Sequence, residues 1–282
     1  TRKAQVRVLI LVEDSPVYYS SFLPLIYKEV VRQTQAVLGG GLNEEHRLLK
    51  MRARPKILHA ATLEEAQALF ARYRDNVLGV LSDTKLPLGG QVDPQAGLGL
   101  LGRMRQEMFD LPLLLISCEP GHRPAAEAIP AAFLDKNDPN LLGEIRSFFL
   151  RHLGFGDFVF RRPDGEEIDR AANLAELEQA VARVPAESLA FHAERNHFSS
   201  WLMARSEISL GSTFREVRAS AFANPEELRR YICESLRHLR ISRQKGVVAQ
   251  FDAAQFDAGV MDFVKIGKGS LGGKARGLAF VA

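Results

Sequence analysis

Cysteine is scarce in this sequence, in which Cys118 and Cys233 are the two that occur. They lie far apart and at no metal-binding spacing, which argues against a disulfide framework and a cysteine-based metal site. This usage is typical of a reducing compartment, so we expect the protein in the cytoplasm. Long apolar runs are missing as well. No stretch approaches the ~20 residues that cross a bilayer as a helix, so we expect no membrane association.

A surplus of charge of either sign is also missing. The 282 residues include 37 lysines and arginines against 34 aspartates and glutamates, a net charge of +3. This balance by itself does not indicate a nucleic-acid partner. The length allows two domains, or one domain with extensions. The first residues, Thr1-Arg2-Lys3, contain neither a signal-peptide core nor a methionine, so we expect the sequence to be part of a longer protein.

The first half does contain a series of short apolar segments that each end in polar residues. Four of them are Val6 to Val12 before Glu13-Asp14, Val77 to Leu81 before Ser82-Asp83, Leu113 to Ile116 before Ser117, and Ala131 to Leu134 before Asp135-Lys136. A fifth strand is expected at residues 56–60. Helix-forming segments alternate with the strands, and Thr62 with Glu65 three residues later predicts the start of one helix. This alternation predicts an α/β fold with a doubly wound, five-stranded parallel sheet.

The polar residues after these strands are candidates for a single site. In an open parallel sheet, ligands bind beyond the carboxyl ends of the strands. Three acids there, Glu13, Asp14 and Asp83, would repel one another and need a hard divalent cation, with Mg²⁺ the usual choice. Lys136 and the Ser117 hydroxyl beside that ion suit a phosphoryl group. A lone aspartate at a strand end is most often a turn or cap residue, but the combination in this chain order favours a site.

These motifs resemble the receiver domain of two-component response regulators over residues 5–152. The resemblance is carried by Glu13-Asp14, Asp83 with Pro87 four residues later, Ser117 after an apolar strand, and Phe133 three residues before Lys136. It implies a flavodoxin-like fold in which Asp83 takes a phosphoryl group while Lys136 and Ser117 contact its oxygens. Phe133 would swing inward when Ser117 moves. The donor would be a histidine kinase or a phosphotransfer protein.

The resemblance also implies a Mg²⁺ site formed by Asp14, Asp83, the Lys85 carbonyl and, through water, Glu13. The chain departs from the family in two places. Asn137 stands where the family usually has a proline, and the first crossover, between about residues 38 and 56, is longer than a minimal receiver needs. The extra length could form a partner surface, although loops also tolerate insertions without any function. A homodimer is left open.

From about residue 154 the pattern changes to apolar stripes at helical spacing, which predicts a mostly helical α+β connector domain over residues 154–260. Within it, His192, His197 and Trp201 could suggest a metal or catalytic site. No cluster of acids or cysteines accompanies them, and histidines in such surroundings more often pack and form hydrogen bonds in a core. We therefore interpret these residues as structural.

Two further helix starts are predicted in the connector, one at Thr213 with Glu216 and one at Asn224-Pro225. The helix from Pro225 to about Lys245 carries several arginines on one face. A basic face could meet the phosphates of a nucleic acid, but solvated helix faces look the same and glutamates interrupt the pattern. We expect no nucleic-acid partner.

The last segment, residues 263–280, is rich in glycine and lysine. Glycine-rich backbone approaches phosphates closely and a lysine that opens a helix adds charge, although the spacing of a Walker P-loop is absent. The segment resembles the opening of the ATP-grasp domain of phosphoenolpyruvate synthase and pyruvate phosphate dikinase. The resemblance implies that Gly272, Gly273 and Lys274 contact a nucleotide. It also implies ATP as a cofactor of a full-length parent, whose ATP-grasp and pyruvate-binding domains would follow.

The sequence therefore predicts a receiver domain at 1–153, a connector at 154–260 and the start of an ATP-grasp domain at 261–282. The leading hypothesis is a phosphorylation-controlled receiver that regulates a phosphoenolpyruvate synthase-like enzyme. By itself the sequence would catalyse nothing beyond its own phosphorylation at Asp83. Two alternatives stay open: an interaction module that works without phosphorylation, and an inert fragment of the phosphotransferase itself.

Overall fold

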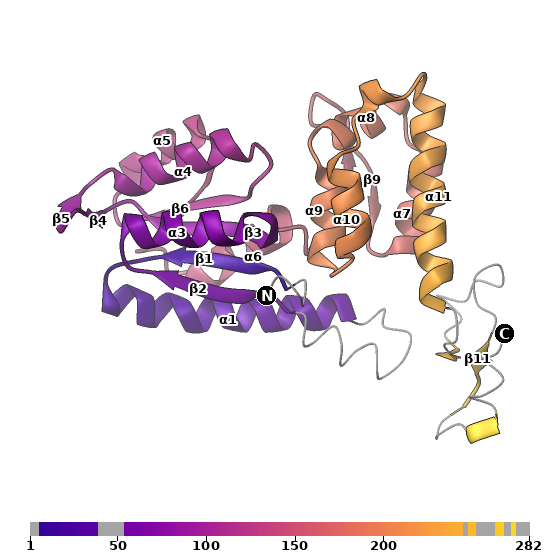
Figure 1. The fold of residues 1–282 in the computed structure, drawn as a ribbon, viewed down its shortest axis with the longest axis horizontal. Helices are drawn as coiled ribbons and strands as arrows, with labels where there is room; N and C mark the ends of the chain where they lie inside the picture. The colour runs from indigo at the N-terminus through magenta and orange to yellow at the C-terminus, as the bar shows by residue number, and fades with distance from the viewer. Residues whose placement is uncertain (1–5, 39–53, 245–247, 252–262, 268–271, 275–282) are drawn as a thin grey trace. The chain divides into compact units, whose positions relative to one another are not determined.

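The structure is a computed structural model, and it describes residues 6–38, 54–244, 248–251, 263–267 and 272–274 (Figure 1). The chain divides into two compact units. Of the described residues, the first unit holds 6–36, 54–156 and 200–208, and the second holds 37–38, 157–199 and those from 209 onward. Most of the long first crossover lies outside the described residues, and the domain limits expected from the sequence stay predictions.

The first unit is built on a sheet of five parallel strands in the order β2-β1-β3-β6-β7. The strands are β1 (Val8–Val12), β2 (Lys56–Ala60), β3 (Val77–Asp83), β6 (Leu113–Ser117) and β7 (Ala132–Asp135). The chain runs from β1 outward to β2 and then returns to β3 on the other side, so the winding reverses beside β1. This order confirms the predicted α/β class with a doubly wound five-stranded sheet, and it places the switch point at the carboxyl ends of β1 and β3.

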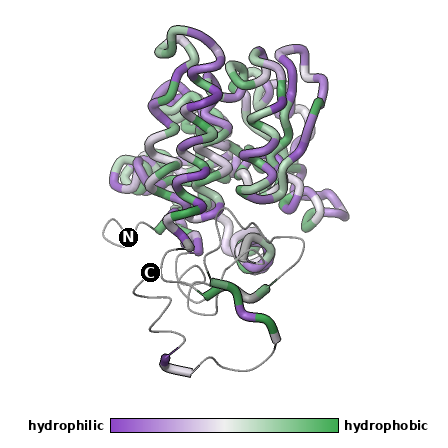
Figure 2. The backbone as a smooth tube through the Cα atoms, turned by 90° about the vertical axis from the view of Figure 1, so that its right-hand side faces the viewer, coloured by the Kyte–Doolittle hydropathy of each residue, from purple (hydrophilic) through white to green (hydrophobic). Residues whose placement is uncertain are grey.

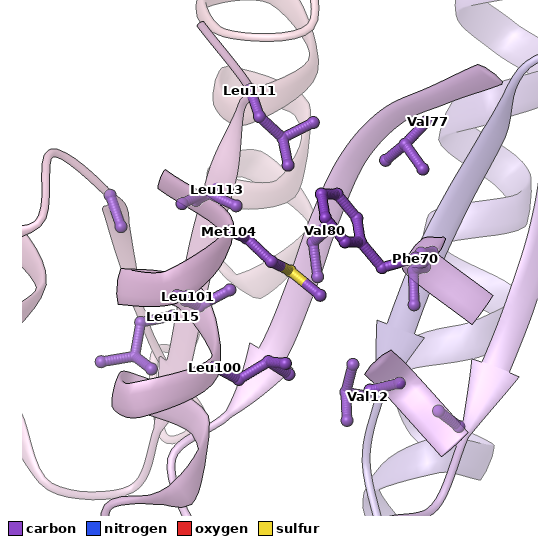
Figure 3. Packing of buried hydrophobic residues seen from close by; sticks show 14 of the residues in the cluster. Val12, Phe70, Val77, Val80, Leu100, Leu101, Met104, Leu111, Leu113 and Leu115 are labelled. Carbon is purple, nitrogen blue, oxygen red and sulfur yellow. The ribbon is translucent and has the colours of Figure 1, made fainter. Parts of the chain in front are cut away.

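Both faces of the sheet are covered, which explains why β1 is apolar at every position and buried along its whole length. On one face, Val12 and Val80 pack against Phe70 of α3 (Leu63–Tyr73) and against Leu100 of α4 (Ala96–Glu107) (Figure 3). Helix α5 (Arg123–Ala128) packs beside β7. Helix α1 (Pro16–Leu38) lies on the opposite side of the strands (Figure 1). Helix α6 (Leu141–Arg151) completes the unit, and a short antiparallel hairpin of β4 (Leu86–Leu88) and β5 (Gln91–Asp93) follows β3.

The second unit begins with an antiparallel hairpin of β8 (Phe158–Arg161) and β9 (Glu167–Ala171). The helices that follow along the chain are α7 (Leu174–Arg183), α8 (Ala186–Glu194), α9 (His197–Ala204), α10 (Ile208–Arg215) and α11 (Pro225–Gln244). Residues 200–208, which include most of α9, belong to the first unit. The predicted mostly helical region is therefore present. None of the helices in the described part of the chain has the length and apolarity needed to cross a membrane.

Helix α11 is amphipathic, and hydrophilic and hydrophobic residues alternate along the helices at the front of Figure 2. Its buried stripe is Leu228, Ile232 and Leu236, and Leu239 farther along the helix is half-buried. Two of its arginines are tied to α7 within the unit. Arg229 donates to the Val184 carbonyl oxygen at 2.9 Å and Arg240 pairs with Glu178. These guanidinium groups therefore help to hold α11 against α7.

A pair of buried histidines lies in the core of the second unit. The His192 Nδ1 and His197 Nδ1 atoms are 2.8 Å apart, and the Arg161 backbone N–H donates to His192 Nε2 at 2.8 Å. Because His192 Nε2 accepts, its proton is on Nδ1, and His192 donates to His197. Burial lowers the pKa of His192 to about 3 and that of His197 to about 4. The pair is thus a neutral core contact, in agreement with the structural role predicted for it.

The glycine-rich tail is described in part. A two-residue parallel pair joins β10 (Ala249–Gln250) and β11 (Val264–Lys265). Gly272, Gly273 and Lys274 are exposed, and the neighbouring residues on both sides of them lie outside the described part of the chain. The nucleotide contacts implied for these three residues therefore stay predictions.

Candidate functional site

The parallel strands bring their carboxyl ends to one edge of the sheet, and the predicted site residues lie there. Asp83, at the end of β3, pairs in register with Ile116, and Ser117, at the end of β6, pairs with Asp135. Glu13 and Asp14 directly follow β1. Within the described residues, the carboxylates of Glu13, Asp14 and Asp83 are the one acidic group arranged to hold a metal, with ligand atoms within 4.8 Å of one another.

Lys136 lies between two of these acids. Its Nζ donates to Glu13 Oε2 and to Asp83 Oδ2, each at 2.7 Å. The side chains are 2% exposed for Lys136, 0% for Glu13 and 13% for Asp83, and Asp14 is half-buried, so solvent reaches the cluster at its two aspartates. We call Glu13, Asp14, Asp83 and Lys136 the acid–lysine cluster.

Burial and the hydrogen bonds to charged partners oppose each other in setting the pKa values of this cluster. Burial by itself would lower the pKa of Lys136, but its hydrogen bonds to Asp83 and Glu13 outweigh burial and raise the pKa, so the ammonium stays charged. Burial raises the pKa of Glu13 despite the opposing hydrogen bond from Lys136. With all groups ionised, three carboxylates face one ammonium and two negative charges stay uncompensated. This surplus and the oxygen-only donor set fit a hard divalent cation such as Mg²⁺.

Backbone and aromatic groups fix the positions of the acids. The Thr84 N–H donates to Asp83 Oδ1 at 2.6 Å, and the Ser15 N–H donates to Glu13 Oε1 at 3.1 Å. The Tyr18 ring at the start of α1 lies 3.9 Å from Lys136 Nζ. Gly97 in α4 packs so tightly against the Asp83 backbone that a Cβ there would lie 1.8 Å from the Asp83 carbonyl oxygen. The nucleophile candidate is therefore held on a rigid element.

The remaining predicted residues of the first unit differ in how they relate to this cluster. Ser117 is buried and lies beside Lys136 in the neighbouring chain segment. The backbone N–H of Lys136 donates to the Ser117 carbonyl oxygen at 2.8 Å. The Lys85 side chain pairs with Glu119 at 2.7 Å and is exposed, so the backbone carbonyl is the part of Lys85 left for a metal. Phe133 is half-buried on β7.

Phe133 lines a separate small cleft of about 250 Å³. The Arg123 guanidinium lies 4.7 Å from the centre of the Phe133 ring. Cation–π contact of this kind helps to hold the ring in the lining of the cleft. The cleft is lined by α5, β7 and α6, and it does not include the acids.

The loop after β7 contains Asn137 at the position where receiver domains usually have a proline. The Asn137 backbone N–H, which a proline would lack, donates to Asp135 Oδ1 at 2.9 Å. The Asn137 side-chain amide donates to the Cys118 carbonyl oxygen at 3.2 Å, which joins this loop to the one after β6. Asparagine thus supplies two hydrogen bonds that fix the loop carrying Lys136.

Several polar residues near the site were not anticipated from the sequence. His122 lies 2.9 Å from the Ser117 hydroxyl through its Nδ1, and the Tyr18 hydroxyl lies 3.1 Å from Cys118 Sγ. His59 Nε2 bonds the Glu13 carbonyl oxygen at 2.8 Å. None of these residues forms a local motif with its partner, so the sequence carried no signal beyond the presence of a titratable side chain near a strand end.

Comparison with known proteins gives a limited result. No family model matches the sequence, and no curated protein matches it. Solved structures that match are response regulators. A receiver domain protein from Clostridium thermocellum is 13% identical, with 52% of this chain and 96% of that chain covered and a TM-score of 0.36. The response regulator TrrA from Thermotoga maritima, in complex with Mg²⁺ and BeF, is 18% identical, with 51% and 99% covered and a TM-score of 0.34.

A phosphorylated cyanobacterial phytochrome response regulator, RcpA, is 12% identical, with 58% of this chain and 99% of that chain covered and a TM-score of 0.36. At these identities and TM-scores, the fold is established by the strand order and pairing of the first unit itself. The switch point of this sheet holds the acid–lysine cluster.

Proposed function

We propose that the first unit is a signal receiver that accepts a phosphoryl group on Asp83. The observation that carries this proposal is the acid–lysine cluster, in which three carboxylates lie within 4.8 Å and Lys136 joins Glu13 to Asp83. A structural ion pair would need one carboxylate for one amine. Three acids around one lysine at a sheet switch point instead suit a site that takes a divalent cation and a phosphoryl group.

The chemistry follows from the positions of these groups. One Asp83 oxygen attacks the phosphorus of the donor in line, the bond from phosphorus to the donor's leaving group breaks, and that group leaves with the electron pair. The product is an acyl phosphate. Both Asp83 oxygens already accept one hydrogen bond, from Thr84 and from Lys136, and each keeps a further lone pair. Lys136 can then turn toward the phosphoryl oxygens.

Mg²⁺ fits the cluster as the implied cation. Asp14, Asp83 and the Lys85 carbonyl would hold it, with Glu13 assisting through water. When bound, it neutralises charge on the transferring phosphoryl group. Removing the cation should therefore prevent phosphorylation, because the carboxylates would repel the incoming anion.

The finer part of the proposal concerns what the receiver controls. The donor would be a histidine kinase or a phosphotransfer protein, and the target would be a phosphoenolpyruvate synthase-like, ATP-dependent enzyme in the same parent chain. Support for the target comes from the tail, where Gly272, Gly273 and Lys274 resemble the opening of an ATP-grasp domain. Phosphorylation would act through a change in charge near Ser117 and Phe133.

Phosphorylation by acetyl phosphate tests the receiver function. The wild-type protein should form an acid-labile phosphoprotein with Mg²⁺ and none with a chelator. Asp83→Asn should remove the label, whereas Asp75→Asn, which changes an exposed aspartate of the same unit, should label like wild type. Equal labelling of wild type and Asp83→Asn would remove Asp83 from the proposal. If beryllofluoride with Mg²⁺ moves no resonance near Asp83 or Ser117, an interaction module independent of phosphorylation becomes the better account.

A further inference from the structure

The Ser117 hydroxyl already has two partners in the structure. Its Oγ lies 2.9 Å from His122 Nδ1 and accepts a hydrogen bond from the Glu119 backbone N–H at 3.1 Å. His122 ends the short 3₁₀ turn Pro120–His122 that follows β6. The Ser117 side chain is buried, and the His122 side chain is 21% exposed. The proposed function uses Ser117 but gives His122 no part.

Counting protons shows why His122 matters. A serine hydroxyl has one proton to donate and two lone pairs that accept. The Glu119 N–H can only donate, so it takes one lone pair of Oγ. When the His122 imidazole is neutral with Nδ1 unprotonated, the single hydroxyl proton goes to Nδ1. A phosphoryl oxygen is purely an acceptor and needs that same proton. His122 and the phosphoryl group therefore compete for it.

We propose that His122 is a positioning residue that holds the Ser117 hydroxyl in a resting arrangement, so that it must be released before Ser117 can bond a phosphoryl oxygen. This inference rests on the proposed phosphoryl-accepting function of Asp83 and adds a control to it. The neighbouring residue extends the control, because the Arg123 guanidinium packs on the Phe133 ring at 4.7 Å. The adjacent residues His122 and Arg123, where α5 begins, thus contact Ser117 and Phe133 respectively.

Protonation of His122 should release the hydroxyl. An imidazolium has a proton on each nitrogen, so Nδ1 becomes a donor to Oγ and the hydroxyl proton is free to serve a phosphoryl oxygen. The charged groups facing His122 are Glu119, whose Oε2 lies 3.6 Å from Nε2, and Lys85, which reaches Glu119 from the segment after β3. The hydrogen bond from Lys85 lowers the pKa of Glu119, so this carboxylate stays ionised over the range in which free histidine titrates.

The experiment measures the dissociation constant of beryllofluoride, with Mg²⁺, for four proteins: wild type, His122→Ala, Ser117→Ala and the double variant. His122→Ala should bind about 2- to 10-fold more tightly than wild type at alkaline pH, the value of one neutral hydrogen bond. In the Ser117→Ala background, removing His122 should change nothing. His122→Asn can place an amide oxygen near the position of Nδ1, so it should restore the wild-type constant.

A pH series separates this control from a merely structural role. The ratio between the wild-type and His122→Ala constants should fall as the medium is made more acidic, because a protonated imidazole leaves the hydroxyl proton of wild type free. His122→Asn should keep the same ratio throughout the series, because an amide does not titrate. A ratio that does not change with pH, or a His122→Ala effect that persists without Ser117, overturns the proposal.

The outcomes also distinguish this inference from the function beneath it. If wild type binds beryllofluoride and His122→Ala binds it equally well or more weakly, the role of His122 is overturned and the receiver function stands. If wild type and Asp83→Asn are alike in failing to bind beryllofluoride and to accept phosphate, the receiver function fails, and the role of His122 fails with it. Circular dichroism of each variant establishes that it is folded.

Discussion

Each unit buries a group of polar side chains, and the two groups differ in charge. The acid–lysine cluster of the first unit keeps its charges, with Lys136 bonded to Glu13 and Asp83 at 2.7 Å. The histidine pair of the second unit is neutral, with His192 donating to His197 at 2.8 Å. Both groups are largely shielded from water. The two groups differ in net charge: one carries a surplus of negative charge and the other carries none.

The histidine pair leaves no charge over, because both rings are neutral, their Nδ1 atoms bond each other and the Arg161 backbone N–H donates to His192 Nε2. The acid–lysine cluster carries a surplus of carboxylates, and two of them, Asp14 and Asp83, are only half-buried. Burying unbalanced charge lowers stability unless something else compensates it. The proposed cation would compensate this surplus, whereas the histidine pair has no charge to compensate.

The largest effect should come from removing the one cation of the cluster. Lys136→Met leaves the buried Glu13 carboxylate facing Asp83 with no cation between them. Breaking a buried ion pair in this way costs about 3 to 5 kcal/mol of unfolding free energy. Urea unfolding in a chelator measures the loss. Millimolar Mg²⁺ should recover part of it, because a cation that binds only the native state stabilises that state.

Lys85→Met is the matched control for this change. Its amine pairs with Glu119 at a similar distance, but the Lys85 side chain is 52% exposed, so its removal should change stability little and independently of Mg²⁺. If Lys136→Met is as stable as wild type in the chelator, the cluster does not depend on its ammonium, and the contrast between the two units loses its basis.

The second effect is a loss of stability in acid that comes from the histidine pair. Histidines in the unfolded chain titrate near pH 6.5, whereas His192 and His197 in the folded chain titrate at about 3 and about 4. Because their folded pKa values are depressed, the unfolded state binds more protons below pH 6.5. The pair therefore stabilises fully above that pH and loses its contribution as the pH falls toward 4. Between about pH 7 and about pH 5.5 the loss is about 2 to 3 kcal/mol.

Hydrogen exchange of the backbone amides of α8 measures the loss of stability in the second unit by itself. This separation is needed because burial also lowers the pKa of His152 in the first unit, which adds its own acid sensitivity. His197→Gln keeps an acceptor for His192 and removes one titrating group, so its acid sensitivity should be about half that of wild type. His238→Gln changes an exposed histidine of α11 and should behave like wild type. Undiminished acid sensitivity in His197→Gln would assign the effect to other groups.

The charged cluster could be predicted from the sequence because its members are fixed by strand ends. Glu13, Asp83 and Ser117 each follow an apolar run, and apolar runs separated by helices dictate parallel strands whose carboxyl ends share an edge. The contacts of His122 and Tyr18 could not be predicted. Each depends on how a helix or turn packs across the sheet edge, which no local pattern encodes.

Helix starts show the same limit on a smaller scale. Thr62 with Glu65 predicted a start correctly, since Thr62 Oγ1 accepts from the Glu65 N–H at 3.2 Å. The same pattern at Thr213 with Glu216 was wrong. Thr213 lies in the last turn of α10 and its hydroxyl donates back to the Ser209 carbonyl oxygen at 3.2 Å. A threonine can serve a helix at either end, and only the packing of the surrounding segments decides which.

The smallest effect on stability should come from replacing exposed, uncharged asparagine side chains, one in each unit. Asn173 begins α7, and its Oδ1 accepts from the N–H groups of Ala175 and Glu176, each at 3.0 Å. Asn173→Ala should lower the unfolding free energy by about 1 kcal/mol. Asn173→Asp should retain most of the wild-type stability, because aspartate caps equally well.

Asn137→Ala, beside the acid–lysine cluster, removes one exposed hydrogen bond, from the side-chain amide to the Cys118 carbonyl oxygen. It should lower the unfolding free energy by about 0.5 kcal/mol. Urea unfolding of the three variants tests whether charge is what separates the units. A loss at Asn137 as large as that of Lys136→Met would show that the loop, and not the ammonium, holds the cluster together.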